Sequence, residues 1–152
     1  MSRLAFVFAL LPALAVARPW QGIVPGGSSC IDVVGKFGEP TKTVTANGLE
    51  VLVYSGARAI KGTVQAQFKC DPTSKEVKRI DVYPEPILDA AAIEKSYGQA
   101  CEATQAQEPC YWKRETAQKH VYFQYAKLGL AVFFKEDGKT VQSFAFLPAK
   151  DK

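Results

Sequence analysis

The sequence predicts an α+β protein with two tandem repeats, each a short helix packed on a three- to four-stranded antiparallel meander. Two segments, residues 28–84 and 89–148, both begin with an amphipathic helix that ends at an aromatic-glycine step. Both continue through strand-like stretches and close at a proline. The two aromatic-glycine steps are separated by nearly the same length of chain as the two closing prolines, Pro84 and Pro148. This spacing favours an internal duplication, although a helix followed by a strand meander is also a common order in unrelated chains.

Residues 1–17 have the pattern of a secretory signal peptide. Arg3 precedes an apolar run over residues 4–16, and the segment ends in the small-x-small pattern Ala15-Val16-Ala17. The run is shorter than the about 20 residues that a membrane-spanning helix needs. Cleavage after Ala17 would leave a mature chain beginning at Arg18, with an earlier cut after Ala15 or an uncleaved anchor as alternatives. We expect a periplasmic or secreted protein with no membrane insertion after cleavage.

The first expected repeat covers residues 18–84. Ser28 or Ser29 is a suitable N-cap for its helix, because a serine hydroxyl accepts a backbone hydrogen bond in the first turn. Gly38, followed by Pro40, ends the helix. The apolar residues at helical spacing are Ile31, Val33, Val34 and Phe37. The expected strands are residues 49–54, 64–69 and 77–83.

The second expected repeat covers residues 85–152. Asp89 is the expected N-cap, Gly98 ends the helix, and Asp137-Gly138 indicates a tight turn between the last two strands. A unit of about 60 residues is only marginally stable alone, so the two repeats should pack together across their short, proline-rich linker. The expected strands are residues 120–126, 130–135 and 140–147.

The four cysteines should form disulfides, because export leads to an oxidising compartment. Cys101 and Cys110 bracket a polar loop, so we pair them and then pair Cys30 with Cys70, although four cysteines allow three pairings. Each bridge is expected to contribute about 2–4 kcal/mol. The chain has no C-x-x-C motif and a single histidine. We therefore expect no metal site, no redox pair and no cofactor.

The start of the first repeat carries a family-like motif. Residues 20–28 contain a Pro25-Gly26-x-Ser28 step into a helix that includes Asp32-Val33 and closes as Phe37-Gly38-Glu39-Pro40. This resembles the opening of the SmpA/OmlA family of small exported proteins, which includes a lipoprotein subunit of the outer-membrane barrel-assembly machinery. Their fold is similar to one repeat of the β-lactamase-inhibitor proteins, so the resemblance implies a tandem arrangement. The chain departs from the family in having no lipid-attachment cysteine and phenylalanine or tyrosine where the family has leucine.

Few residues are available for catalysis. His120 is the only histidine, and the chain has no G-x-S-x-G elbow, phosphate-binding loop or dinucleotide fingerprint. Removing the leader, which contains Arg3, would lower the formal charge from +4 to +3, which is too small and too evenly spread for a nucleic-acid or membrane partner. We expect no catalytic residues. A carboxylate pair drawn from Asp81, Asp89 and Glu94 keeps a small secreted hydrolase as an alternative.

The second expected sheet has large side chains on both faces, whereas a sheet covered on one face should be polar on the other. Either its outer face packs against the first repeat, or it is an exposed aromatic surface for a protein partner. The candidate partner-binding residues are Trp112, Tyr122, Phe133 and Phe144. The predicted function is an exported, non-catalytic protein-binding module of the bacterial envelope, inhibitor-like in one version. An envelope structural or assembly factor is the other alternative.

Overall fold

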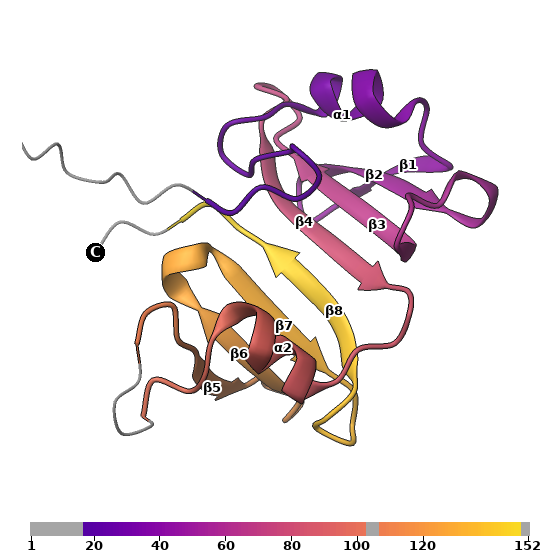
Figure 1. The fold of residues 1–152 in the computed structure, drawn as a ribbon. Helices are drawn as coiled ribbons and strands as arrows, with labels where there is room; N and C mark the ends of the chain where they lie inside the picture. Colours follow the sequence, from indigo (N-terminus) through magenta and orange to yellow (C-terminus); the bar gives the residue numbers. More distant parts are fainter. Residues whose placement is uncertain (1–16, 103–106, 150–152) are drawn as a thin grey trace, which may run out of the picture.

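A computed structural model describes residues 17–102 and 107–149 as an α+β fold (Figure 1). Residues 1–16, nearly all of the expected leader, lie outside these ranges. The helices are α1 (Cys30–Phe37) and α2 (Ala90–Tyr97), with short 3-10 helices η1 (Gly56–Arg58) and η2 (Ala126–Leu128). The strands are β1 (Lys42–Ala46), β2 (Leu49–Ser55), β3 (Thr63–Cys70), β4 (Val77–Pro84), β5 (Trp112–Glu115), β6 (Val121–Tyr125), β7 (Leu130–Phe134) and β8 (Val141–Phe146).

Both helices begin and end where the sequence predicts. Ser29 caps α1 through a capping box, in which its hydroxyl accepts the Asp32 N–H and the Asp32 carboxylate accepts the Ser29 N–H. Asp89 caps α2 by accepting the Ala92 N–H at 2.8 Å. Gly98 ends α2 at a φ of 117°, and a Cβ there would overlap the Pro109 carbonyl oxygen. Only glycine fits this position.

The eight strands form one antiparallel sheet in the order β1-β2-β3-β4-β8-β7-β6-β5. The last strands of the two halves, β4 and β8, pair at its centre, where Asp81 lies opposite Ala145. The α+β prediction is therefore confirmed. The two halves meet edge to edge, so the outer face of the second half does not pack onto the first half. Its large side chains need another explanation.

Strands β1 and β5 were not among the expected ranges, although six other strands were. Both are the outermost strands of the sheet, and every residue in them is exposed. They therefore lack the alternation of buried and exposed residues by which strands are recognised. Asn47-Gly48, with both φ angles positive, forms the β1–β2 turn. Asn-Gly is a strong hairpin signal, and it would have predicted β1.

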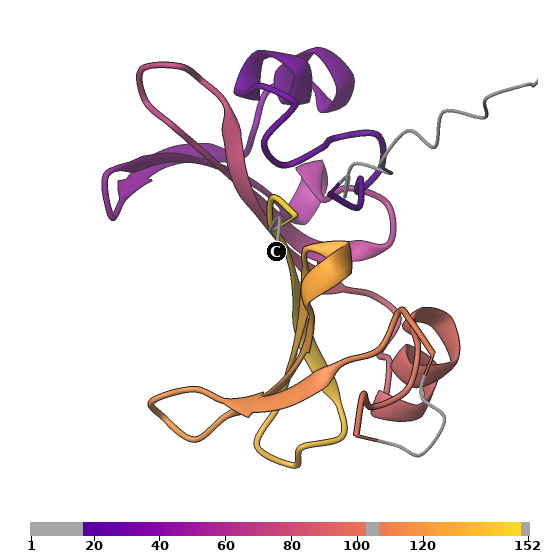
Figure 2. The same ribbon diagram turned by 90° about the vertical axis from the view of Figure 1, so that its left-hand side faces the viewer.

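Both helices pack on the same side of the sheet, as Figure 2 shows. On α1, Phe37 stacks against Phe68 of β3, with ring centroids 5.7 Å apart. On α2, Tyr97 packs edge-on against Phe144 of β8, with centroids 6.3 Å apart. The sheet therefore has one helix-covered side and one side without helices.

One hydrophobic cluster runs through both halves on the helix-covered side. Trp20, which precedes α1, joins them because its ring centroid lies 5.9 Å from that of Phe68 in the first half and 6.5 Å from that of Phe146 in the second. The larger fully buried side chains are Tyr54, Tyr125, Phe68, Phe134, Ile80, Ile93 and Leu130. We expect the halves to depend on each other for stability.

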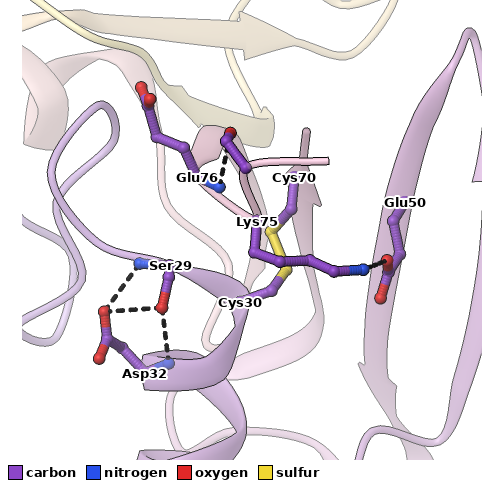
Figure 3. Close-up of a disulfide and its surroundings, with 8 residues drawn as sticks. Ser29, Cys30, Asp32, Glu50, Cys70, Lys75 and Glu76 are labelled. Carbon is purple, nitrogen blue, oxygen red and sulfur yellow. Dashed lines mark hydrogen bonds and ion pairs between the residues drawn. A yellow bond between two sulfur atoms is a disulfide. The ribbon is translucent and has the colours of Figure 1, made fainter. Parts of the chain in front are cut away.

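Both expected disulfides are present, Cys30–Cys70 and Cys101–Cys110. Figure 3 shows the first, which ties the start of α1 to the end of β3. Beside it the Cys30 N–H donates to the Lys75 carbonyl at 2.8 Å, and the Lys75 ammonium pairs with Glu50 at 2.7 Å. The bridge thus lies within a set of contacts that fastens α1 to the first half of the sheet.

A tyrosine holds the end of each helix. The Tyr54 hydroxyl donates to the Gly38 carbonyl at 2.8 Å, and the Tyr125 hydroxyl donates to the Gly98 carbonyl at 2.7 Å. Both hydroxyls keep their protons at neutral pH, because the ordinary pKa of a phenol lies well above 7 and burial, the largest cause, raises it further. Each bond satisfies a carbonyl that the helix leaves without an internal partner.

We expect Tyr54→Phe and Tyr125→Phe each to lower the free energy of unfolding by about 1–2 kcal/mol, because each leaves a partly buried carbonyl without its donor. Tyr122→Phe is the matched control, since no hydrogen bond of the Tyr122 hydroxyl is found within the described residues. Its effect should stay below about 0.5 kcal/mol. Urea unfolding followed by circular dichroism measures all three. Equal effects in the three variants would contradict the assignment.

Candidate functional site

The side of the sheet opposite the helices is called here the open face. Side chains directly opposite one another on paired strands point to the same side of a sheet. One such row crosses all eight strands, and alternate residues in each strand extend it. The row is Lys42, Val53, Gln67, Asp81, Ala145, Ala131, Gln124 and Trp112.

The open face is hollowed. Figure 2 shows the sheet as an arc whose ends project away from both helices. Two hollows, of about 300 Å³ and about 350 Å³, lie over β4, β6, β7 and β8. They share Arg79, Thr116 and Phe133 in their linings, so they are neighbouring parts of one depression. Ala131 and Ala145 in this row, and Ser143 on the same face of β8, have small side chains, which leaves room above the middle of the sheet.

Three of the four candidate aromatic residues lie on the open face. Tyr122 and Phe133 are opposite each other on β6 and β7, partly exposed, with stacked rings whose centroids are 5.0 Å apart. Trp112 is 44% exposed on the edge strand β5. Phe144 does not belong with them. It is 6% exposed and packs against Tyr97 on the helix-covered side, because its register partner Val132 faces the core.

A compact ionic cluster lies beside the aromatic residues. The Asp81 side chain, 7% exposed, accepts from the Lys69 ammonium at 2.7 Å and from the Arg79 guanidinium Nη2 at 2.8 Å. Arg79 Nε donates to the same carboxylate at 2.9 Å. A nearly buried carboxylate is stable here because two cations share it, and the cluster keeps one net positive charge. Burial, and then the charge of Asp81, raise the pKa of the neighbouring Tyr83 phenol.

Cations outnumber carboxylates on this surface. Among the described strand residues of the open face, Asp81 supplies the one carboxylate. The cationic residues are Lys42, Lys69, Arg79 and Arg114. Elsewhere in the described chain, the ion pairs join one cation to one carboxylate, as in Lys75–Glu50. The open face therefore presents a positive potential beside aromatic side chains.

One of the hollows contains residue types that a hydrolase would need. His120, Ser143 and Asp81 all line it. Within the described residues, however, no hydrogen bond joins the His120 imidazole to either of the other two, and the Asp81 carboxylate is held by Lys69 and Arg79. A nucleophile needs a base within hydrogen-bond reach, and a base needs an orienting partner. The arrangement does not assemble these contacts.

Two further searches cover the described residues alone. They contain no group of three or more His, Cys, Asp or Glu side chains placed to hold a metal ion. No helix within residues 17–102 and 107–149 has the length and apolar composition needed to cross a membrane.

Sequence reasoning missed the ionic cluster. From Arg79 to Val82, the charged residues Arg79 and Asp81 alternate with the apolar residues Ile80 and Val82. This alternation places the charged pair on one face, and it could have pointed to the open face. The participation of Lys69 depends on its pairing with Arg79 across β3 and β4, which no local pattern specifies.

Comparison with known proteins gives the fold alone. No family model and no curated protein matches the sequence. The chain is similar to a solved structure of a DUF4309 family protein, YjgB from Bacillus subtilis, with a TM-score of 0.55 and 15% identity over 86% of each chain. A cysteine-rich secretory protein from Staphylococcus aureus is 13% identical, with a TM-score of 0.43 over 80% of this chain and 42% of its own. This second likeness carries no argument, and neither transfers a function.

Proposed function

We propose that the protein is an exported, non-catalytic binding module of the bacterial envelope that holds a protein partner on the open face. One observation carries the proposal: partly exposed aromatic side chains and a hollow lie together on the side of the sheet that no helix covers. Contiguous exposed aromatic surface on a small protein is typical of an interaction site.

The dimensions of the open face favour a macromolecular partner. From Trp112 on β5 to Lys69 on β3, the face crosses five inter-strand steps of about 4.8 Å, which makes about 24 Å. A small ligand would fill one hollow and leave most of this width in water. A protein surface or loop would contact both ends and the depression between them. An inhibitor-like protein, which places a partner across such a sheet, is one form of this function.

We also propose that the two halves arose by duplication of one unit, with boundaries at residues 18–84 and 85–152. Each half has the same order of elements, a helix, two strands, a 3-10 turn and two strands. In each, a tyrosine at the end of the second strand donates to the carbonyl of the glycine that ends the helix. The resemblance to the SmpA/OmlA family and to the β-lactamase-inhibitor repeats belongs to this proposal.

Export is the remaining part of the proposal. The leader pattern of residues 1–17 supports it, and so do the two disulfides, which persist in oxidising compartments. Cleavage after Ala17 would make Arg18 the first residue. Sequencing of the exported protein's amino terminus tests this point, and a protein recovered inside the cell with its leader intact would contradict it.

The binding function is tested by capture. The immobilised protein is expected to retain at least one protein from an extract of the source cell's exported proteins, and the double variant Trp112→Ala/Tyr122→Ala should lose it. Each aromatic anchor is expected to contribute about 2 kcal/mol or more to binding, so the double loss exceeds a hundredfold in affinity. Surface plasmon resonance with the captured protein gives the dissociation constants.

Ile87→Ala is the matched control, because Ile87 is an apolar side chain that is 77% exposed and lies outside the strands of the open face. It should bind like the unaltered protein. Equal retention by the double variant and by the control would contradict the open face as the binding site. Near-ultraviolet circular dichroism of each variant establishes that the fold persists.

A further inference from the structure

The open face offers an anion a defined position. Arg79 lines both hollows, and its guanidinium contacts the Asp81 carboxylate through Nε and Nη2. A guanidinium has five N–H donors, so donors remain after these two contacts. Its side chain is 36% exposed, whereas that of Asp81 is 7% exposed. The guanidinium is thus fixed by a buried carboxylate on one side and accessible on the other.

The neighbours of Arg79 add an apolar contact and more positive charge. Phe133 lines the same two hollows and stacks on Tyr122. Lys69 of β3 lies directly opposite Arg79 of β4, and Arg114 of β5 lies directly opposite Tyr122 of β6. Asp81 cannot neutralise both Lys69 and Arg79, so the middle of the face keeps a positive charge. The positive charge that Asp81 leaves uncompensated therefore lies in the hollow, beside the aromatic side chains.

We propose that the partner is an acidic protein segment that places an aspartate or glutamate carboxylate on Arg79 and an apolar side chain against Phe133 and Tyr122. This inference rests on the proposed function of the open face and names the chemistry of its partner. A carboxylate is favoured because it matches the paired N–H groups of a guanidinium and forms charge-assisted hydrogen bonds. Charge complementarity of this kind also speeds association at low salt.

The inference is tested with defined peptides and the disulfide-bonded protein. Three pools of short synthetic peptides of equal length share phenylalanine and leucine and differ in their third component, which is acidic, amide or basic. Binding is followed by nuclear magnetic resonance of the isotope-labelled protein. The acidic pool should bind at least about tenfold more tightly than the amide pool and shift the signals of Arg79 and Phe133. Added salt should weaken this binding.

Two variants locate the carboxylate. Arg79→Gln should weaken binding of the acidic pool about tenfold and leave the amide pool unchanged. Lys78→Gln is the matched control. Lys78 directly precedes Arg79 on β4, the substitution removes the same charge, and the Lys78 ammonium pairs with Glu76. Arg114→Gln, at an exposed position, should give a smaller loss and keeps the test valid if Arg79→Gln fails to fold.

The outcomes separate the two claims. If the amide pool binds the open face as tightly as the acidic pool, or if Arg79→Gln binds like the control, the acidic partner is wrong while the binding face stands. If no pool shifts any open-face signal, both claims are overturned. If free glutamate binds as tightly as the acidic peptides, the position accepts small carboxylates and the protein segment is wrong.

Discussion

Phe68→Ala should lower the free energy of unfolding by about 3–5 kcal/mol, among the largest effects of any single substitution in this chain. Phe68 is fully buried on β3, and its ring centroid lies 5.7 Å from those of Phe37 and Tyr54 and 5.9 Å from that of Trp20. Removing the ring loses its burial and leaves a cavity among three aromatic groups that cannot all move into it. Urea unfolding measures the change.

Phe68→Ala should lower the stability of both halves of the molecule together. Small proteins have total stabilities of about 5–15 kcal/mol, so this substitution removes a large part of the total. Because Trp20 bridges Phe68 and Phe146, and β4 pairs with β8, we expect probes in both halves to report one transition at the same urea concentration. Two separated transitions would show that the halves unfold independently.

Val64→Ala is the matched control on the same strand. Val64 is 57% exposed, so truncating it removes little buried surface. The expected change is within about 0.5 kcal/mol. A loss comparable with that of Phe68→Ala would indicate that strand propensity on β3, and not the buried ring, determines the stability.

The helices could be predicted from the sequence because their determinants are local. Ser29 and Asp89 cap the helices, and Gly38 and Gly98 end them, through contacts within a few residues. The joining of the halves was not predictable in the same way. Whether β4 pairs with β8 or the two sheets stack depends on which edges and faces meet, and no residue near Asp81 or in β8 specifies that choice locally.

The candidate site was partly predictable for a similar reason. Tyr122 and Phe133 lie in strands with clear alternation, so their common face followed from the pattern once their register was known. Phe144 was placed wrongly because β8 is buried on both sides: Ala145 is 0% and Ser143 9% exposed, against 6% for Phe144. In such a strand hydrophobicity does not tell one face from the other. The direction of Phe144 depends on its pairing partners in β7 and β4, which the sequence pattern of β8 does not show.

Removing the Cys30–Cys70 bridge by Cys30→Ala/Cys70→Ala should lower the free energy of unfolding by about 4 kcal/mol. The bridged cysteines are 40 residues apart, against 9 for Cys101 and Cys110. Loop-closure entropy grows with the logarithm of loop length, so the shorter bridge should contribute about 2.5 kcal/mol. Cys30 and Cys70 are also almost fully buried, which adds the loss of packed sulfur atoms to the larger value.

The matched variant Cys101→Ala/Cys110→Ala makes this a comparison within one fold. The difference between the two variants should be about 1 kcal/mol or more, measured by urea unfolding at neutral pH without reductant. The order also follows from position, since Cys30–Cys70 fastens α1 to the sheet that carries Phe68, beside the Lys75–Glu50 ion pair. An equal or reversed order would mean that local packing around the shorter bridge outweighs the entropy of closing the longer loop. Because both halves share one hydrophobic cluster, either variant should still unfold in a single transition, at a lower urea concentration than the parent protein.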